Sequence, residues 1–221
     1  MFWVILAIII LVGAIYYARR KDAITVIRKE DYVPLKLIKK HFGAVEDNQN
    51  PPFQYLKNKY ALSCNHFSES ADYIIVVAIF SAKKFKQETS IEIDNQLIHF
   101  FFDLHLCLSS KLFAPNYDTD ISSAIISGIH FKYFGQPSQN KISTSLDLIA
   151  TKETCYLDSL FDLFKQEDFA LMLAAFAYFS ATGELVGAAA GLSISKTVLE
   201  IIKDASPLME ARINDIMKTK V

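Results

Sequence analysis

The side chains best suited to chemistry gather in one short stretch of the sequence, HFFFDLHLC, which holds His99, Asp103, His105 and Cys107. Imidazole, carboxylate and thiolate groups are the usual ligands of Zn²⁺. On a helix, His99 and Asp103 are four residues apart and share a face, while His105 points elsewhere. On a strand, Asp103, His105 and Cys107 would share a face instead. The surrounding residues favour the helix.

Two interpretations of this stretch follow. A metal-dependent hydrolase would bind its metal around His99, Asp103 and His105, with Cys64 and His66 brought near by folding, although this spacing matches no common structural zinc pattern. Alternatively, His99 and Asp103 form a hydrogen-bonded pair in a phenylalanine-rich helix, because buried polar groups normally find partners. We expect the second arrangement, and therefore no metal, no cofactor and no catalytic residue.

Other polar motifs favour structural roles. Asp118 and Asp120 form a D-x-D that could hold a divalent cation together with a third carboxylate, but such clusters before a helix more often cap it. His130 is expected to be a solvated residue on the polar face of its helix. The sequence contains no GxGxxG, GxxxxGK[ST], HExxH or GxSxG motif, which lowers the weight of the common nucleotide-binding and hydrolase classes.

Small residues recur every four positions in the run GELVGAAAGLSIS, at Gly183, Gly187, Gly191 and Ser195. This spacing places them in one groove of a helix, where a second helix can approach closely. The 13-residue run resembles the glycine-zipper pattern of membrane-active helices. Glu184 within the run makes a bilayer-spanning helix costly. We therefore expect this helix-packing stripe to face the apolar segment 169–182 inside the helical domain.

The composition favours a helical globular domain. Of the 221 residues, 52% are hydrophobic and 21% are charged, and only 7 are glycine and 6 proline. So few turn residues are unsuited to a β-sandwich or barrel, and the composition excludes disordered and collagen-like chains. Cys64, Cys107 and Cys155 are widely spaced and odd in number, which fits a reducing compartment and no disulfide framework.

The first 18 residues, MFWVILAIIILVGAIYYA, carry no charged side chain. At a rise of about 1.5 Å per residue they form a rod of about 27 Å, close to the roughly 30 Å hydrocarbon core of a bilayer. Arg19, Arg20 and Lys21 follow at once, which predicts an N-terminus outside and a C-terminal domain in the cytoplasm. The sequence therefore predicts a single-pass anchor that contacts the lipid bilayer through residues 1–18. A cleaved signal peptide is the weaker alternative, because a positive n-region is missing.

Residues 19–43 form a basic juxtamembrane segment. Residues 19–40 contain eight basic and three acidic side chains, whereas residues 41–221 have an excess of six acidic ones. Anionic lipid headgroups attract such a basic segment. The candidate membrane-surface residues are Arg19, Arg20, Lys21, Arg28 and Lys29. A solvated topology signal is the alternative, and the acidic remainder argues against nucleic acid as a partner.

Residues 44–59, which contain Pro51 and Pro52, are predicted to be a linker, and residues 60–221 an α-helical globular domain. Apolar periodicity and end signals predict helices over residues 68–86, 90–114, 121–134, 156–164, 169–182, 184–205 and 206–218. The second of these is expected to be central and buried. Asp120 and Gly135 are the expected caps of the third, residues 135–145 are expected to be a loop, and Ser206 with Pro207 is expected to start the last.

These features predict a mostly α-helical protein, in which a single-pass transmembrane helix precedes a cytoplasmic domain of about six to seven helices. We expect a membrane-tethered interaction or regulatory module that recruits a protein partner at the cytoplasmic membrane face. Two alternatives remain open. One is a membrane-perturbing effector that inserts residues 169–195, and the other is the metal-dependent hydrolase around His99, Asp103 and His105.

Overall fold

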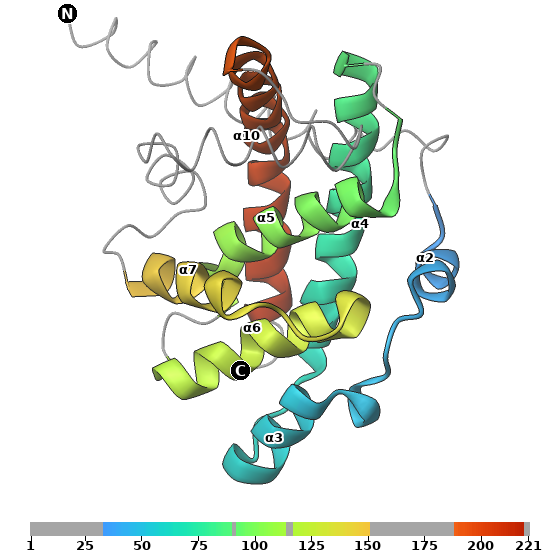
Figure 1. The fold of residues 1–221 in the computed structure, drawn as a ribbon. Helices are drawn as coiled ribbons and strands as arrows, with labels where there is room; N and C mark the ends of the chain where they lie inside the picture. The colour runs from blue at the N-terminus through green and yellow to red at the C-terminus, as the bar shows by residue number, and fades with distance from the viewer. Residues whose placement is uncertain (1–32, 90–91, 114–116, 151–187, 219–221) are drawn as a thin grey trace, which may run out of the picture. The chain divides into compact units, whose positions relative to one another are not determined.

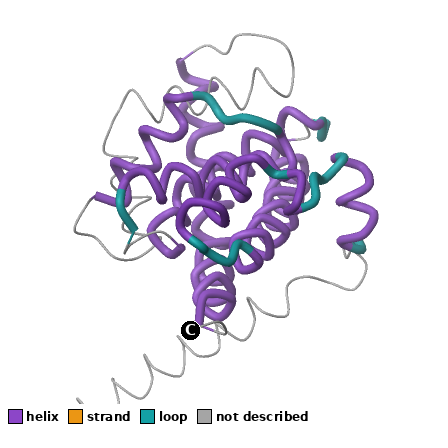
Figure 2. Tube along the Cα trace, turned by 90° about the horizontal axis from the view of Figure 1, so that it is seen from below, coloured by secondary structure: helices purple, strands orange, loops and turns teal. Residues whose placement is uncertain are grey.

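A computed structural model describes residues 33–89, 92–113, 117–150 and 188–218. The chain divides into two compact units, residues 1–34 and 35–221, and the helices below belong to the second. Every regular element of the described residues is a helix (Figure 2), which confirms the mostly α-helical class. Within these ranges, none of the helices combines the length and the apolar character needed to cross a bilayer.

Several predictions fall outside the described residues. These are the anchor 1–18, the basic residues Arg19, Arg20, Lys21, Arg28 and Lys29, the predicted helices 156–164 and 169–182, and Gly183 and Gly187 of the helix-packing stripe. The other two stripe residues, Gly191 and Ser195, lie on helix α10 (Ala188–Lys218). The predicted packing of the stripe on residues 169–182 is therefore untested.

The helices of residues 35–221 follow one another as α2 (Leu35–Phe42), the 3₁₀-helix η2 (Asp47–Gln49), α3 (Pro51–Tyr60), α4 (Asn65–Thr89), α5 (Asn95–Phe113), α6 (Thr119–Phe134), α7 (Gln139–Ala150) and α10. Helices α4 and α10 run side by side, and α5 packs on both (Figure 1). Helix α6 contacts α3, α4, α5 and α7. Helix α7 also contacts α5, and α4, α5 and α6 together form the centre of the packing.

Helix α5 is the buried central helix that the sequence predicts. Leu97, Phe101, Phe102 and Leu108 are fully buried, and burying one such side chain contributes roughly 1.5–3 kcal/mol. The helix begins after Asp94, whose Oδ1 accepts a hydrogen bond from the backbone N–H of Leu97 at 2.7 Å. The Asp94 side chain thus supplies an acceptor for a backbone N–H that has no partner within the first turn of the helix.

The predicted linker 44–59 is instead largely helical, because α3 occupies its second half and continues to Tyr60. Pro51 and Pro52 take the first two helical positions, where a backbone N–H has no helical partner to lose. The Oδ1 of Asn50 caps the helix by accepting a hydrogen bond from the N–H of Phe53 at 3.3 Å. The Pro-Pro pair therefore marks the start of a helix rather than a linker.

Helix α3 lies unusually close to α6. The fully buried Asn50 donates a hydrogen bond through Nδ2 to the carbonyl oxygen of Gly128 at 2.8 Å. The Phe53 ring packs directly over Gly128, where an added Cβ would lie 2.1 Å from the ring. Gly128 thus permits the close approach of α3 to α6.

Helix α6 differs from its prediction in two respects. Asp118, not Asp120, is its N-cap, since Asp118 Oδ1 accepts a hydrogen bond from the N–H of Ile121 at 2.9 Å. Gly135 ends the helix with φ of 73°, as predicted. The predicted polar face is largely absent, because the polar side chains Ser122, Ser127, His130 and Lys132 are buried against neighbouring helices.

Two further helix boundaries correct the predictions. Residues 139–150 form α7, so the predicted loop 135–145 ends at Ser138, whose Oγ accepts a hydrogen bond from the N–H of Lys141 at 3.4 Å. Helix α10 continues through Pro207, although a new helix was predicted there. A buried apolar face spans the proline on both sides, with Ile202 and Met209 fully buried, so tertiary packing outweighs the lost backbone hydrogen bond.

Candidate metal centre

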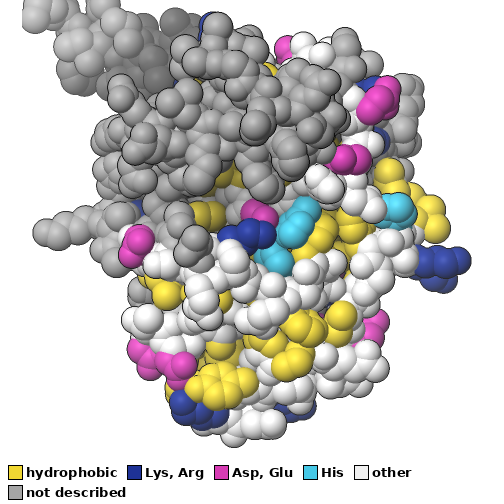
Figure 3. Space-filling view, in the orientation of Figure 1, with side chains coloured by type: hydrophobic (Ala, Val, Ile, Leu, Met, Phe, Trp, Pro, Cys, Tyr) yellow, Lys and Arg dark blue, Asp and Glu magenta, His cyan; other side chains and the backbone are white. Residues whose placement is uncertain are grey.

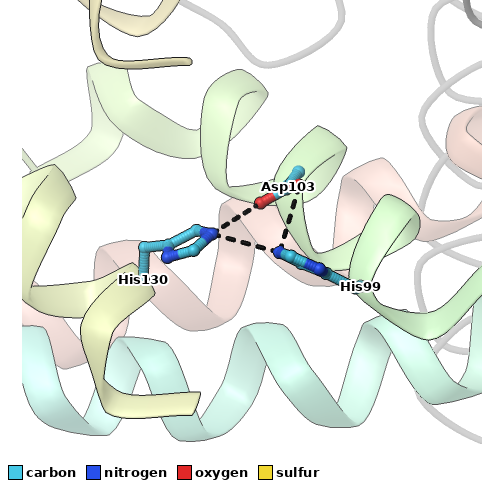
Figure 4. A group of neighbouring side chains, drawn as sticks. All are labelled: His99, Asp103 and His130. Atoms are coloured by element: carbon cyan, nitrogen blue, oxygen red, sulfur yellow. Dashed lines mark hydrogen bonds and ion pairs between the residues drawn. The ribbon is translucent and has the colours of Figure 1, made fainter. Parts of the chain in front are cut away.

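Three side chains that can hold a metal ion meet between α5 and α6. His99 and Asp103 lie one turn apart on α5 and share a face, as their spacing predicts, and His130 reaches toward them from α6 (Figure 4). One ligand atom from each of the three lies within 4.8 Å of the others. His99 and Asp103 are thus neighbours, as the sequence predicts, but the group has a third member.

The separations within this His99–Asp103–His130 cluster are short and similar. The Nε2 of His99 lies 3.4 Å from Asp103 Oδ2, and the Nε2 of His130 lies 3.2 Å from Asp103 Oδ1. The two Nε2 atoms are themselves 3.2 Å apart. Ligand atoms about 2.0–2.2 Å from a tetrahedral zinc ion are separated by roughly 3.3–3.6 Å. The two histidines approach different oxygens of Asp103, and one ligand atom from each of the three residues lies within 4.8 Å of the others, close enough for the three to share one ion.

His130 is only 2% exposed, which corrects the prediction of a solvated residue. Its Nδ1 lies 2.6 Å from the carbonyl oxygen of Gly135. Because a carbonyl only accepts hydrogen bonds, Nδ1 donates to it, and Nε2 is the ring nitrogen that faces the cluster. A backbone carbonyl that holds the second nitrogen is the usual outer contact of a metal-ligating histidine.

The cluster brings two imidazole nitrogens and a carboxylate together with one ammonium group. Asp103 Oδ1 is buried, and His130 Nε2 lies 3.2 Å from it. Asp103 Oδ2 and His99 Nε2 both face Lys141 Nζ. A cation bound between the three side chains would contact all of them.

Lys141, from the first turn of α7, supplies one positive charge at the edge of the cluster. Its Nζ forms an ion pair with Asp103 Oδ2 and lies 3.4 Å from His99 Nε2. The His99 ring stacks on Phe134, with centroids 4.0 Å apart and an interplanar angle of 6°. The lysine thus approaches the cluster beside a ring that Phe134 holds in place.

Burial and neighbouring charges set the protonation states of His99 and Asp103 on α5. Burial lowers the pKa of His99 to about 4, against an opposing contribution from Asp103. Burial alone would raise the pKa of Asp103, but the hydrogen bond from His130 and the charges of His99 and Lys141 hold it below its ordinary value. At neutral pH, His99 is therefore a neutral potential ligand and Asp103 a carboxylate.

The other residues of the predicted zinc site lie elsewhere. His105 is fully buried on another side of α5, with Nε2 2.8 Å from Ser81 Oγ, and burial lowers its pKa to about 3. Burial raises the pKa of the Cys107 thiol to about 12. Cys64 donates weakly to the carbonyl of Phe53 at 3.6 Å. His130, and not the predicted His105, therefore lies beside His99 and Asp103.

Asp120 belongs to a different, exposed cluster. Its Oδ2 accepts hydrogen bonds from Tyr55 at 2.7 Å, Tyr60 at 2.6 Å and Lys59 at 3.0 Å. The hydrogen bonds from Tyr60, Tyr55 and Lys59 lower the pKa of Asp120 to about 2. This carboxylate is saturated by donors that join α3 to α6, so the D-x-D motif forms no cation site here.

Comparisons with known proteins identify no family for this chain. No family model matches the chain, and neither the curated proteins nor the solved structures contain a match. The geometry of the His99–Asp103–His130 cluster is therefore the basis for the functional argument.

Proposed function

We propose that the protein binds a divalent transition-metal ion of the zinc class through His99 Nε2, the Asp103 carboxylate and His130 Nε2. The observation that carries this proposal is the convergence of two imidazole nitrogens and one carboxylate from two helices, with one ligand atom from each lying within 4.8 Å of the others. Two imidazoles and one carboxylate suit zinc and its neighbours better than Mg²⁺ or Ca²⁺, which prefer oxygen ligands.

Three protein ligands leave one position of a tetrahedral ion open. This is the arrangement of catalytic zinc, whereas structural zinc sites are closed by four protein ligands. An open position can hold water, which zinc activates at neutral pH for hydrolysis. The metal-dependent hydrolase weighed from the sequence therefore becomes a more specific hypothesis, with His130 in the place given to His105.

Zinc binding by the full-length protein tests this proposal. The protein, kept in mild detergent, is stripped with a chelator, dialysed against Zn²⁺ and measured by elemental analysis. We expect one zinc ion per chain in the wild type, and no bound zinc in His99→Ala, His130→Gln or Asp103→Asn. Magnesium at the same concentration should not compete.

Two histidines outside the cluster provide matched controls. His41 is exposed and hydrogen-bonded to Asn95, so His41→Ala should retain all the zinc. His105→Gln should also retain it, because His105 lies on another side of α5. Zinc that is lost in His105→Gln but kept in His130→Gln would restore the original ligand set and contradict the proposal.

We also propose that residues 1–18 tether this helical domain to a membrane and that the domain recruits a protein partner at the cytoplasmic face. The uncharged run 1–18 followed by Arg19, Arg20 and Lys21 supports the tether. Deleting residues 1–21 should convert a carbonate-resistant membrane protein into a soluble one. A deleted chain that stays in the membrane pellet would contradict the tether and favour insertion through residues 169–195.

A further inference from the structure

We infer that the metal centre takes a small oxyanion, such as a phosphate or carboxylate group, as its fourth ligand, and that Lys141 is the second cationic contact of this anion. The inference rests on the proposed metal site and goes on to name the chemistry of its open position. It depends on where Lys141 lies, because its Nζ contacts Asp103 and approaches His99, both of which would be ligands.

The cluster has a closed side and an open side. His130 is 2% exposed and Asp103 is 18% exposed, whereas His99 and Lys141 are 34% and 37% exposed. Figure 3 shows histidine side chains at the surface next to basic and acidic ones. The exposed side of the cluster is the side of His99 and Lys141, so a ligand from solvent would reach the proposed metal beside Lys141.

A bound metal ion would change the charges around the Lys141 ammonium group. Without metal, the ammonium group offsets the Asp103 carboxylate and approaches the lone pair of His99. A divalent ion takes the lone pairs of both groups and repels the nearby ammonium. Asp103 supplies a single negative charge against the ion and Lys141, so the loaded site keeps an excess of positive charge.

An anionic oxygen ligand would offset this excess of positive charge. Its charge offsets the metal ion, and a second oxygen of the same group can accept a hydrogen bond from Nζ of Lys141. Charge-assisted hydrogen bonds of lysine to phosphate and carboxylate are among the stronger polar contacts in proteins. A phosphate dianion should therefore bind more tightly than acetate, and both should require the metal.

Calorimetric titration of inorganic phosphate into the zinc-loaded full-length protein, with free zinc removed, tests this inference. We expect one phosphate per bound zinc, weaker binding of acetate, and no phosphate binding to the metal-free protein. In Lys141→Met, phosphate should bind about tenfold more weakly or worse. Zinc should bind this variant more tightly, because no ammonium competes at the site. A misfolded variant cannot show both changes.

Lys86 provides the matched control, since it is a lysine paired with an exposed carboxylate, Glu92, and with no member of the cluster. Lys86→Met should leave both affinities unchanged, and Lys141→Arg should retain phosphate binding. Equal phosphate affinity in Lys141→Met and wild type would overturn the inference, as would equal affinity in metal-free and loaded protein. If the wild type binds zinc but not phosphate, the inference fails while the metal site stands; a wild type without zinc refutes both.

Discussion

Two carboxylates, Asp72 and Asp103, are each held between helices at similar exposures of 13% and 18%, but their surroundings differ in kind. Asp72 Oδ1 accepts a hydrogen bond from the Tyr133 hydroxyl at 2.6 Å and pairs with Lys132 Nζ at 2.7 Å. Its Oδ2 pairs with Lys39 Nζ at 2.7 Å. Asp103 instead faces two imidazole nitrogens and one ammonium group.

Asp72 and Asp103 differ in the hydrogen-bonding groups that surround them. Every close partner of Asp72 is a donor, and Lys132 completes its own hydrogen bonds with the carbonyl and hydroxyl oxygens of Ser68 at 3.0 and 2.6 Å. Burial and the neighbouring Asp72 carboxylate raise the pKa of Tyr133, so its hydroxyl remains a donor. The Asp72 cluster is saturated by donors and is structural, whereas the Asp103 cluster brings together two imidazoles and a carboxylate, which a bound cation would complete.

The largest effect should follow from breaking the complete cluster. Asp72→Ala leaves Lys132, which is 5% exposed, as a buried ammonium without its carboxylate. Breaking a buried ion pair costs about 3–5 kcal/mol. We expect a loss of this size in the free energy of unfolding, measured by urea denaturation of the zinc-free protein. A loss below about 1 kcal/mol, the range of exposed pairs, would show that the cluster is not structural.

Both clusters use residues of α6, so displacing this helix should disturb both. Gly128→Ala places a methyl group against the buried Phe53 ring, and overpacking costs about 1–3 kcal/mol. The gain in helix propensity of about 1 kcal/mol offsets only part of this cost. We expect a lower melting temperature by calorimetry and weaker zinc binding through His130. An unchanged or higher melting temperature would contradict the close approach of α3 and α6.

His105 lies outside both clusters and provides a pH dependence of its own. Its pKa is about 3 in the folded protein against about 6.5 in an unfolded chain. Between these values the unfolded chain binds the extra proton, so stability is full above about pH 6.5 and falls by up to about 1.4 kcal/mol per pH unit below it. In urea titrations from pH 7 to pH 5, His105→Gln should lose stability less steeply than wild type. Equal pH dependence of stability in the two proteins would show that a group other than His105 causes it.

The smallest effect on stability should come from the cluster proposed to be functional. Asp103→Asn removes a carboxylate whose ionic partner Lys141 is 37% exposed and can reach solvent, so we expect a change below about 1 kcal/mol in the metal-free protein. Saturating zinc should raise the melting temperature of the wild type and leave this variant unaffected. A metal-free loss as large as that of Asp72→Ala would make Asp103 another structural carboxylate.

Part of this contrast is visible in the sequence. Four-residue spacing predicts the contact of His99 with Asp103, and the apolar run around them predicts the burial of α5. No local signal identifies His130 as the third member, because it lies 31 positions from His99. Its polar neighbours on α6, such as Lys132, suggest a solvated face. Burial of that face depends on α3, α4 and α7 packing around the helix, which periodicity alone does not describe.

The helix boundaries that differ from prediction have a similar origin. Pro51 and Pro207 are local stop or turn signals, yet the first starts α3 and the second lies inside α10. The N-cap residue of α3, Asn50, donates a hydrogen bond to the carbonyl oxygen of Gly128 on α6. In α10, a continuous apolar face packs on α4 and α5. Contacts distant in sequence therefore decide how each proline is used.

The most direct test of the central claim is the position of zinc in a crystal of the protein. Anomalous scattering at the zinc absorption edge locates the ion without reference to activity. We predict a single strong peak between α5 and α6, about 2.0–2.2 Å from His99 Nε2, His130 Nε2 and an oxygen of Asp103. A zinc-soaked crystal with no peak there, with the Lys141 ammonium still seated against His99 and Asp103, would contradict the account.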